Sequence, residues 1–300
     1  MIRTTTRIAR YMSLVVWLLT ACAGVHAQTS QLEQKALDLP GGKVIYQDSG
    51  GQGVAVVFLF AGTTALWQHQ ATAIPQAGYR FIAIDYRGLG AMPGSDMLKA
   101  VTGIDELLNR LGVNKFHLVG AAVGGVMAWQ YALLHPDKLR SLSVSNSLGN
   151  LRDPDTNALE SSLRPPPFGE LPREVRDLSA SYRASNPEGV KRFLELAPPP
   201  APRPAQSTGA ASGAPPSTAA GPAGAPNPNA LTWDKVAQFP LPTLMMTGDG
   251  DLYTPPSIMR MFVARLKNGK AVVIEDSGHA SYWENPEAFN RALLSFIAER

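Results

Sequence analysis

The sequence lacks the features that mark disulfide-stabilised, metal-binding and nucleotide-binding proteins. Its only cysteine among 300 residues is Cys22, so no disulfide can form within one chain. It has no cysteine and histidine cluster at metal-ligand spacing, no dinucleotide fingerprint and no phosphate-binding loop. These absences exclude a disulfide scaffold and predict that the protein uses no cofactor.

An excess of charge is also missing outside the N-terminus. The formal net charge is +3, but Arg3, Arg7 and Arg10 lie in the first ten residues, which contain no acidic residue. Without these three arginines, the number of lysines and arginines falls from 27 to 24, which equals the number of acidic residues. The part of the chain that follows these ten residues has no excess of positive charge, so there is no electrostatic reason to expect nucleic-acid binding.

Residues 1–27 have the layout of a secretory signal peptide. A basic start is followed by a short apolar run from about Met12 to Ala21 and then by small residues. The run is too short to span a bilayer stably. Two cleavage positions stay open, because "VHA" before Gln28 suits ordinary signal peptidase while "LTAC" ending at Cys22 resembles a lipoprotein box. We expect a protein exported to the bacterial periplasm, or one associated with the membrane of the cell envelope through a lipid anchor on that cysteine.

Strand-like runs alternate with helical patterns over residues 28–150 and 231–300. "VAVVFLF", "YRFIAID" and "PTLMMTGDGD" have the composition of strands, and "GGVMAWQYALLHP" has helical spacing and stops at a proline. Such alternation is typical of βαβ units on a mostly parallel sheet. The sequence therefore predicts an α/β core built from these two segments.

The segment between the two core parts breaks this rhythm. Residues 151–197 are helix-rich and are interpreted as an inserted cap. Residues 198–230 are nearly all Pro, Ala, Gly, Ser and Thr. This composition has too few large apolar side chains to offset the entropy of ordering, so we expect a disordered tether.

Four separated stretches occur in an order that resembles the α/β-hydrolase family. They are "VVFLFAGTTALW", "IAIDYRGLGAMP", "GAAVGG", and the pair "GDGDLYTP" and "SGHASYWENPEAF". The chain departs from the family at Ala61, where members usually have histidine, and at Met92, where they usually have serine. The resemblance implies an α/β-hydrolase fold with a mostly parallel sheet flanked by helices and a helical cap insertion.

The third stretch, "GAAVGG", resembles the strand-to-helix elbow that carries the family's nucleophile. Its small residues Gly120 and Gly124 would leave room for one exposed side chain on a sharp turn. Family members usually have serine at that place, whereas this chain has Ala122. The resemblance also implies an oxyanion hole made by the backbone N–H groups of Thr63 and Val123.

The fourth pair of stretches supplies the acid and the base in this resemblance. Asp251 is preferred to Asp249 as the acid because of its place relative to "TPP", and His279 in "SGH" is the base. In such a triad the histidine takes the nucleophile's proton, and the aspartate orients the ring and stabilises the imidazolium. The site therefore resembles an acyl-transfer apparatus whose attacking atom is missing.

Three interpretations of Ala122 stay open. The protein is an exported hydrolase of the carboxylic-ester type whose serine has been replaced, either as an inactivated variant or as a pseudoenzyme. Alternatively, Asp251 and His279 work as a dyad without a covalent intermediate, as in lyase-type or cofactor-free chemistry. In the third interpretation, the protein binds a small ligand under its cap without catalysis. The expected partner is a small, ester-like molecule in the first interpretation.

Overall fold

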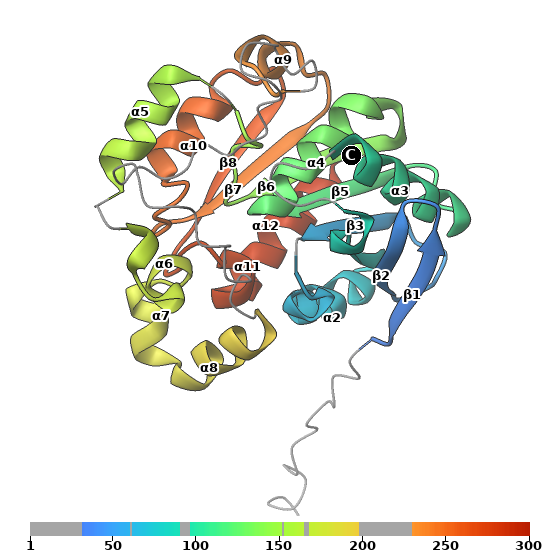
Figure 1. Ribbon diagram of the computed structural model, residues 1–300, viewed down its shortest axis with the longest axis horizontal. Coiled ribbons are helices and arrows are strands. Elements are labelled where there is room, and N and C mark those ends of the chain that lie inside the picture. Colours follow the sequence, from blue (N-terminus) through green and yellow to red (C-terminus); the bar gives the residue numbers. More distant parts are fainter. Residues whose placement is uncertain (1–31, 61, 91–96, 152, 165–167, 198–229) are drawn as a thin grey trace, which may run out of the picture. The chain divides into compact units, whose positions relative to one another are not determined.

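The computed structural model describes residues 32–60, 62–90, 97–151, 153–164, 168–197 and 230–300. The predictions for residues 1–27, Ala61, Met92 and most of the tether lie outside the described residues. The described part of the chain contains an eight-stranded sheet with the strand order β1-β2-β4-β3-β5-β6-β7-β8 (Figure 1).

The sheet is antiparallel at one edge and parallel elsewhere. β1 pairs with β2, and β2 with β4, in antiparallel register, whereas all pairs from β4 through β3 to β8 are parallel. The strands are β1 (Gln34–Leu39), β2 (Gly42–Asp48), β3 (Ala55–Phe60), β4 (Arg80–Asp85), β5 (Phe116–Ala121), β6 (Leu139–Ser145), β7 (Thr243–Gly248) and β8 (Gly269–Ile274). The predicted mostly parallel α/β sheet is confirmed, and β1, a largely exposed strand, is an addition to it.

The helices of the described residues follow the strands along the chain. They are η1 (Thr64–Trp67), α2 (Gln68–Gln76), η2 (Arg87–Leu89), α3 (Met97–Arg110), α4 (Val123–Leu134), η3 (Pro136–Lys138), α5 (Pro154–Leu163), η4 (Phe168–Glu170), α6 (Arg173–Asp177), α7 (Ala180–Ser185), α8 (Pro187–Leu196), α9 (Trp233–Gln238), α10 (Pro256–Val263), α11 (Ser281–Glu284) and α12 (Pro286–Ala298). None of these helices is long and apolar enough to cross a bilayer.

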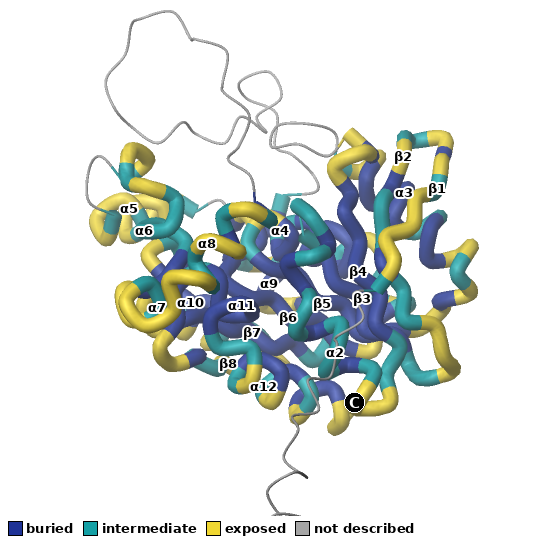
Figure 2. Tube along the Cα trace, turned by 90° about the horizontal axis from the view of Figure 1, so that it is seen from below, coloured by how far each residue is buried: buried dark blue, intermediate teal, exposed yellow. Residues whose placement is uncertain are grey.

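Two hydrophobic cores cover the two faces of the sheet. Because side chains alternate along a strand, Val57 and Leu59 of β3 face one core and Val56 and Phe58 face the other. The first core is closed by α3, α4, α9 and α10, and the second by α2, α11 and α12. Figure 2 shows the buried strands between these layers. A sheet buried on both faces explains why the parallel strands are continuous apolar runs.

The helices α5 to α8 lie between β6 and β7 in the sequence, where the cap is expected. Leu178 and Phe193 of this segment join the second core, the one that contains α11 and α12. Figure 1 shows α6, α7 and α8 on the side of the sheet where α11 lies. The segment is thus packed beside the ends of β7 and β8, and it brings its side chains to the loops that follow these strands.

Candidate active site

The residue at the turn from β5 into α4 has a strained backbone. Ala122 has φ 50° and ψ −121°, a conformation that residues with a side chain rarely adopt. Its N–H donates to the carbonyl of Ser145 at the end of β6 (3.0 Å), and its carbonyl accepts from the N–H of Gly125 (3.0 Å). These bonds hold the turn at the carboxyl end of the sheet, and the strain costs of order 1–3 kcal/mol.

The glycines around this turn are required by its packing. A Cβ atom on Gly120 would lie 2.4 Å from the carbonyl oxygen of Gly124. A Cβ atom on Gly124 would lie 2.0 Å from the carbonyl oxygen of Leu59 in β3. Both distances are far below contact, so the first turn of α4 approaches the strands closely only because these two residues lack side chains.

The backbone N–H groups predicted as oxyanion donors belong to neighbouring loops. Thr63 follows β3 and Val123 follows β5, and these two strands are hydrogen-bonded to each other. Val123 is the first residue of α4, so its N–H has no acceptor within the helix. Val123 is 44 % exposed, which leaves this turn accessible from solvent.

The loops after β7 and β8 bring Asp251 and His279 into contact. The Nδ1 atom of His279 lies 3.0 Å from Oδ1 of the buried carboxylate of Asp251. Asp249 instead accepts hydrogen bonds from the backbone N–H groups of Asp276 (3.2 Å) and Ser277 (3.0 Å). Only Asp251 therefore orients the imidazole, and with Nδ1 protonated the second ring nitrogen, Nε2, can accept a proton.

The surroundings of Asp251 stabilise its ionised form. Burial by itself raises the pKa of Asp251, but the charge and hydrogen bond of His279 and hydrogen bonds from Asn146 and the N–H of Tyr253 lower it to about 2. The bonds from Asn146 Nδ2 and Tyr253 N measure 2.9 Å and 2.8 Å. The carboxylate is thus charged over the whole physiological range.

The carboxylate in turn makes His279 a stronger base. Burial lowers the pKa of His279, but the charge and hydrogen bond of Asp251 outweigh burial, and the pKa lies above its ordinary value of 6.5. Asp177 raises it further and Arg164 lowers it. A partly buried imidazole with this partner can take up a proton during a reaction.

Asn146, directly after β6, is a residue of this site that the sequence prediction missed. Its Nδ2 donates to Oδ2 of Asp251 and to the carbonyl of Gly278 (3.2 Å), and its Oδ1 accepts from the hydroxyls of Ser145 and Ser281. Its φ of 55° is a value that asparagine tolerates. The available signal in the sequence was an asparagine at the carboxyl end of a parallel strand. Asn146 connects Asp251 to the loop that carries His279.

Tyr253 and two cap arginines adjoin the histidine and were also missed. The ring of Tyr253 packs against that of His279 with 4.3 Å between the centroids. Arg164, which caps the end of α5, donates to the carbonyl of Tyr253 (2.9 Å), and Arg176 of α6 donates to its hydroxyl (3.3 Å). The cap therefore places two guanidinium groups against Tyr253, and the ring of Tyr253 lies against the imidazole of His279.

A buried carboxylate fastens the cap to the loop that carries His279. Glu284 accepts hydrogen bonds from the backbone N–H groups of Ser179 in the cap (2.7 Å) and Gly278 in the loop (2.8 Å). The N–H of Ala280 donates to the carbonyl of Asp177 (3.0 Å). The cap and this loop therefore behave as one unit in the structure.

The remaining described histidines lie elsewhere. His117 in β5 bonds to Ser141 (2.8 Å), and burial together with Arg140 lowers its pKa to about 4. His135 caps the end of α4, and His69 lies in the first turn of α2. Among the described residues, no group of three His, Cys, Asp or Glu side chains is placed to hold a metal.

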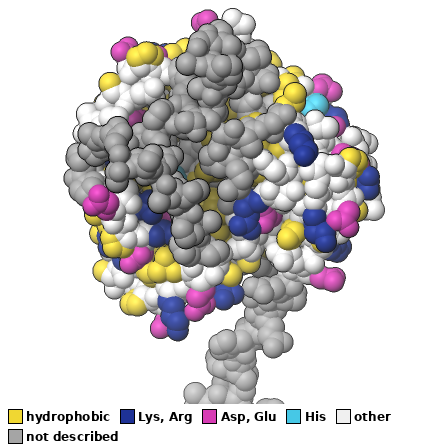
Figure 3. Space-filling view, in the orientation of Figure 1, with side chains coloured by type: hydrophobic (Ala, Val, Ile, Leu, Met, Phe, Trp, Pro, Cys, Tyr) yellow, Lys and Arg dark blue, Asp and Glu magenta, His cyan; other side chains and the backbone are white. Residues whose placement is uncertain are grey.

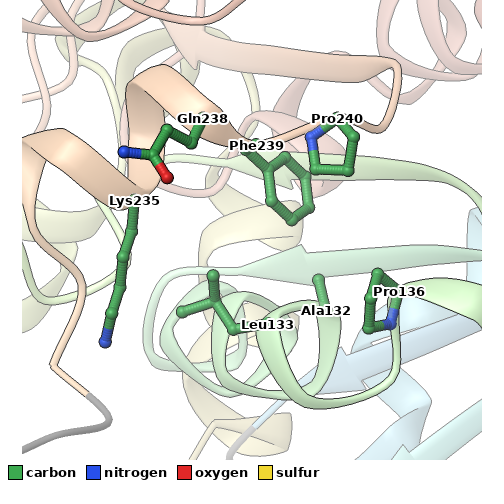
Figure 4. Close-up of a pocket in the computed structure, with 7 residues that line it drawn as sticks. All are labelled: Ala132, Leu133, Pro136, Lys235, Gln238, Phe239 and Pro240. Atoms are coloured by element: carbon green, nitrogen blue, oxygen red, sulfur yellow. The ribbon is translucent and has the colours of Figure 1, made fainter.

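A pocket between α4 and α9 lacks the residue types that catalyse acyl transfer. Figure 4 shows its lining, which comes from the second half of α4, the following Pro136 and the end of α9. The lining residues are Ala132, Leu133, Pro136, Lys235, Gln238, Phe239 and Pro240. The pocket contains no carboxylate and no histidine, so the candidate site stays at the carboxyl edge of the sheet.

Comparison with known proteins gives matches over most of the chain. Residues 56–286 match the family profile described as alpha/beta hydrolase fold. The BpoC protein of Mycobacterium tuberculosis, named as a non-heme bromoperoxidase, is 25 % identical over 264 residues, which are 84 % of this chain and 96 % of BpoC. A 2-hydroxy-6-oxononadienedioate/2-hydroxy-6-oxononatrienedioate hydrolase of Burkholderia vietnamiensis is 25 % identical over 281 residues, 85 % of this chain and 91 % of the relative.

Solved structures agree with the fold. The thermophilic esterase from Thermogutta terrifontis superposes with a TM-score of 0.65 and 23 % identity, covering 89 % of this chain and 98 % of the esterase. This likeness concerns the fold alone. Since the family profile matches well over half of the residues, and the sheet and its helices have the arrangement that the profile describes, the chain belongs to the alpha/beta hydrolase fold family.

Proposed function

We propose that the carboxyl edge of the sheet is an acyl-transfer site of the carboxylic-ester hydrolase type in which the nucleophile position, residue 122, holds alanine. The observation that carries this proposal is the backbone of Ala122, with φ 50° and ψ −121° at the strand-to-helix turn. Such strain persists where the surrounding structure imposes it, and this turn is the one that exposes a nucleophile in hydrolases of this fold. The dyad of Asp251 and His279 supports the same assignment.

The roles of the other groups follow from this assignment. With a hydroxyl at position 122, Nε2 of His279 would take its proton, and Asp251 would hold the Nδ1–H and stabilise the imidazolium. The N–H groups of Thr63 and Val123 would bind the oxyanion that develops on the ester carbonyl. With alanine the covalent step cannot occur, and removal of a triad nucleophile lowers kcat about a million-fold in an unrelated protease. The chain as it stands then binds a small ester-like ligand and hydrolyses it very slowly.

The test is restoration of the hydroxyl. Ala122→Ser should raise the hydrolysis of p-nitrophenyl butyrate at least a thousand-fold, and a serine-directed phosphonate should label residue 122. Ala121→Ser is the matched control, because residue 121 is a buried position inside β5 and its hydroxyl would not be presented on the turn. A folded Ala122→Ser variant with neither gain nor labelling contradicts the proposal.

The intact dyad favours a second candidate function for the unmodified chain. Asp251 is fully buried and keeps its hydrogen bonds although residue 122 has no proton to give. His279 could then deprotonate a substrate or a water molecule directly. This candidate requires turnover by the unmodified chain with a pH profile set by one histidine. His279→Ala should abolish that turnover, and His69→Ala should not. Ligand binding that survives His279→Ala with no turnover in either chain would favour a binding protein.

The N-terminal sequence supports export as part of the proposal. A basic start, a short apolar run and small residues before Gln28 suit a secretory signal, and Cys22 suits a lipid anchor. In a bacterial host, cell fractionation should place the full chain in the envelope. Loss of membrane association in Cys22→Ser would support the anchor, whereas unchanged recovery in the soluble periplasm would favour cleavage before Gln28.

A further inference from the structure

The cap brings two arginines to Tyr253, whose ring packs on the imidazole of His279. Arg164 and Arg176 both bond to Tyr253, one to its carbonyl and the other to its hydroxyl, and Tyr253 packs on His279 at 4.3 Å. The guanidinium of Arg164 also lies 5.5 Å from the centre of the Tyr253 ring. The two cations thus approach one aromatic side chain from different helices of the cap.

The ion pairs of the cap leave Arg176 without a carboxylate partner among the described residues. Arg164 pairs with Glu160 (3.3 Å) and Arg173 with Asp177 (2.9 Å). Arg176 contacts the neutral hydroxyl of Tyr253. A guanidinium that is partly buried and not neutralised attracts an anion.

The Nε atoms of both arginines also indicate that an anion binds here. The Nε–H groups of Arg164 and Arg176 are buried and have no hydrogen-bond acceptor among the described residues. A buried N–H without an acceptor is unfavourable, and more so on a charged group. The edge formed by Nε and a terminal nitrogen is the one with which arginine binds a carboxylate through two parallel hydrogen bonds.

We propose that Arg164 and Arg176 form the subsite for a carboxylate on the ligand, so that the preferred ester is the monoester of a dicarboxylic acid. Such a molecule carries its scissile ester at one end and its negative charge at the other. The charged end would bind in the cap beside Tyr253, and the ester would lie toward His279. This inference rests on the proposed function for the ester, but the anion subsite itself requires no catalysis.

Binding to the unmodified chain tests the subsite without any reaction. Calorimetry would compare monophenyl glutarate with phenyl pentanoate, an ester of the same length without the second carboxylate. We expect the monoester to bind at least tenfold more tightly, and the preference to shrink as salt is raised. Equal affinities, or no measurable binding of the monoester, overturn the proposal.

Variants assign the preference to the arginines. Arg176→Met should lower the preference for the monoester tenfold or more, and Arg176→Lys, which keeps the charge but not the forked geometry, should leave part of it. Arg192→Met is the matched control, because Arg192 lies exposed on α8 and pairs with Glu195. A preference unchanged in both Arg176 variants, with native circular dichroism, overturns the proposal.

The outcome separates this inference from the proposed function. If the monoester binds in an arginine-dependent way but the Ala122→Ser variant hydrolyses neither ester, the result contradicts the hydrolase proposal alone. Hydrolysis of both esters at equal kcat/KM by the Ala122→Ser variant, without an effect of Arg176, would contradict the carboxylate subsite alone.

Discussion

The elbow and the dyad corner, the latter formed by Asn146, Asp251 and His279, lie at the same edge of the sheet but differ in what maintains them. In the dyad corner, side chains make the decisive contacts, and each polar group of Asp251 has a partner. At the elbow, the decisive features are backbone angles and missing side chains: a strained Ala122 between Gly120 and Gly124. The geometry of the elbow therefore depends on the backbone and on two glycines, and not on a reactive side chain at residue 122.

The shape of the turn at residue 122 does not depend on the side chain of that residue. Packing of α4 against β3 and β5 holds the turn, and that packing depends on two glycines rather than on residue 122. A change at residue 122 leaves those contacts in place. On the face shown in Figure 3, acidic and basic side chains of the described residues are intermixed.

The largest effect should come from the dyad corner once the elbow can react. In the Ala122→Ser background, Asp251→Asn should lower kcat about ten-thousand-fold, because an amide can donate to Nδ1 and stabilise the wrong tautomer of His279. Asp249→Asn should have a much smaller effect, since Asp249 bonds only to backbone N–H groups. Steady-state kinetics on p-nitrophenyl butyrate would measure both. Equal losses would mean that the two regions do not form one catalytic site.

A smaller effect, on stability, should distinguish Asn146 from Asn150, another asparagine with a positive φ. Asn146→Gly should lower the free energy of unfolding by about 2 kcal/mol, because Asp251 loses a donor. Asn150 also has a positive φ, 59°, but is exposed, so Asn150→Gly should change stability by less than about 0.5 kcal/mol. Urea unfolding would measure both variants, and similar losses would contradict the role assigned to Asn146.

The effect of Asn146→Gly should also depend on pH. The pKa of Asp251 is about 2 in the folded protein, below its ordinary value of 3.8. The stabilisation from ionised Asp251 is therefore present above pH 3.8 and is lost as the pH falls through about 2. The difference in unfolding free energy between parent and variant should shrink over this window. A constant difference would show that Asn146 acts only through other contacts.

The smallest effect should come from relieving strain at the elbow. Ala122→Gly should raise the free energy of unfolding by about 1 kcal/mol, because glycine adopts the positive φ without a Cβ penalty. Ala121→Gly, one residue earlier in the extended strand β5, should lower it by about 1 kcal/mol. Thermal unfolding of the pair would test the sign. A loss of stability in both variants would mean that the turn stores no strain.

Much of the fold follows from local features of the sequence. The apolar runs of β3, β4 and β7 and the helical spacing of α4 occur where they were predicted. The edge strand β1 was missed because its residues are mostly exposed and carry no clear alternation. A buried strand can be predicted from its run of apolar side chains. An exposed edge strand has no such run, because backbone hydrogen bonds to the neighbouring strand hold it in place.

The candidate site divides in the same way. Gly120, Ala122 and Gly124 are close in the chain, and the short stretch that they form predicted a sharp turn after a strand because it resembles the elbow of the family. Asp251 and His279 could be suggested only by resemblance, because 28 residues separate them and periodicity carries no distance over that length. Their contact comes from parallel strands that end at one edge of the sheet.

The sequence by itself determined the alternation of strands and helices, the tight turn at residue 122 and the absence of a hydroxyl there. Only the tertiary structure decided that Asn146 supports Asp251, that Tyr253 packs on His279, and that Arg164 and Arg176 reach this tyrosine from the cap. The physical reason is that local patterns depend on neighbouring residues, whereas these contacts depend on how distant segments pack. The sequence around a cap arginine is the same whether its side chain faces solvent or lies near a histidine.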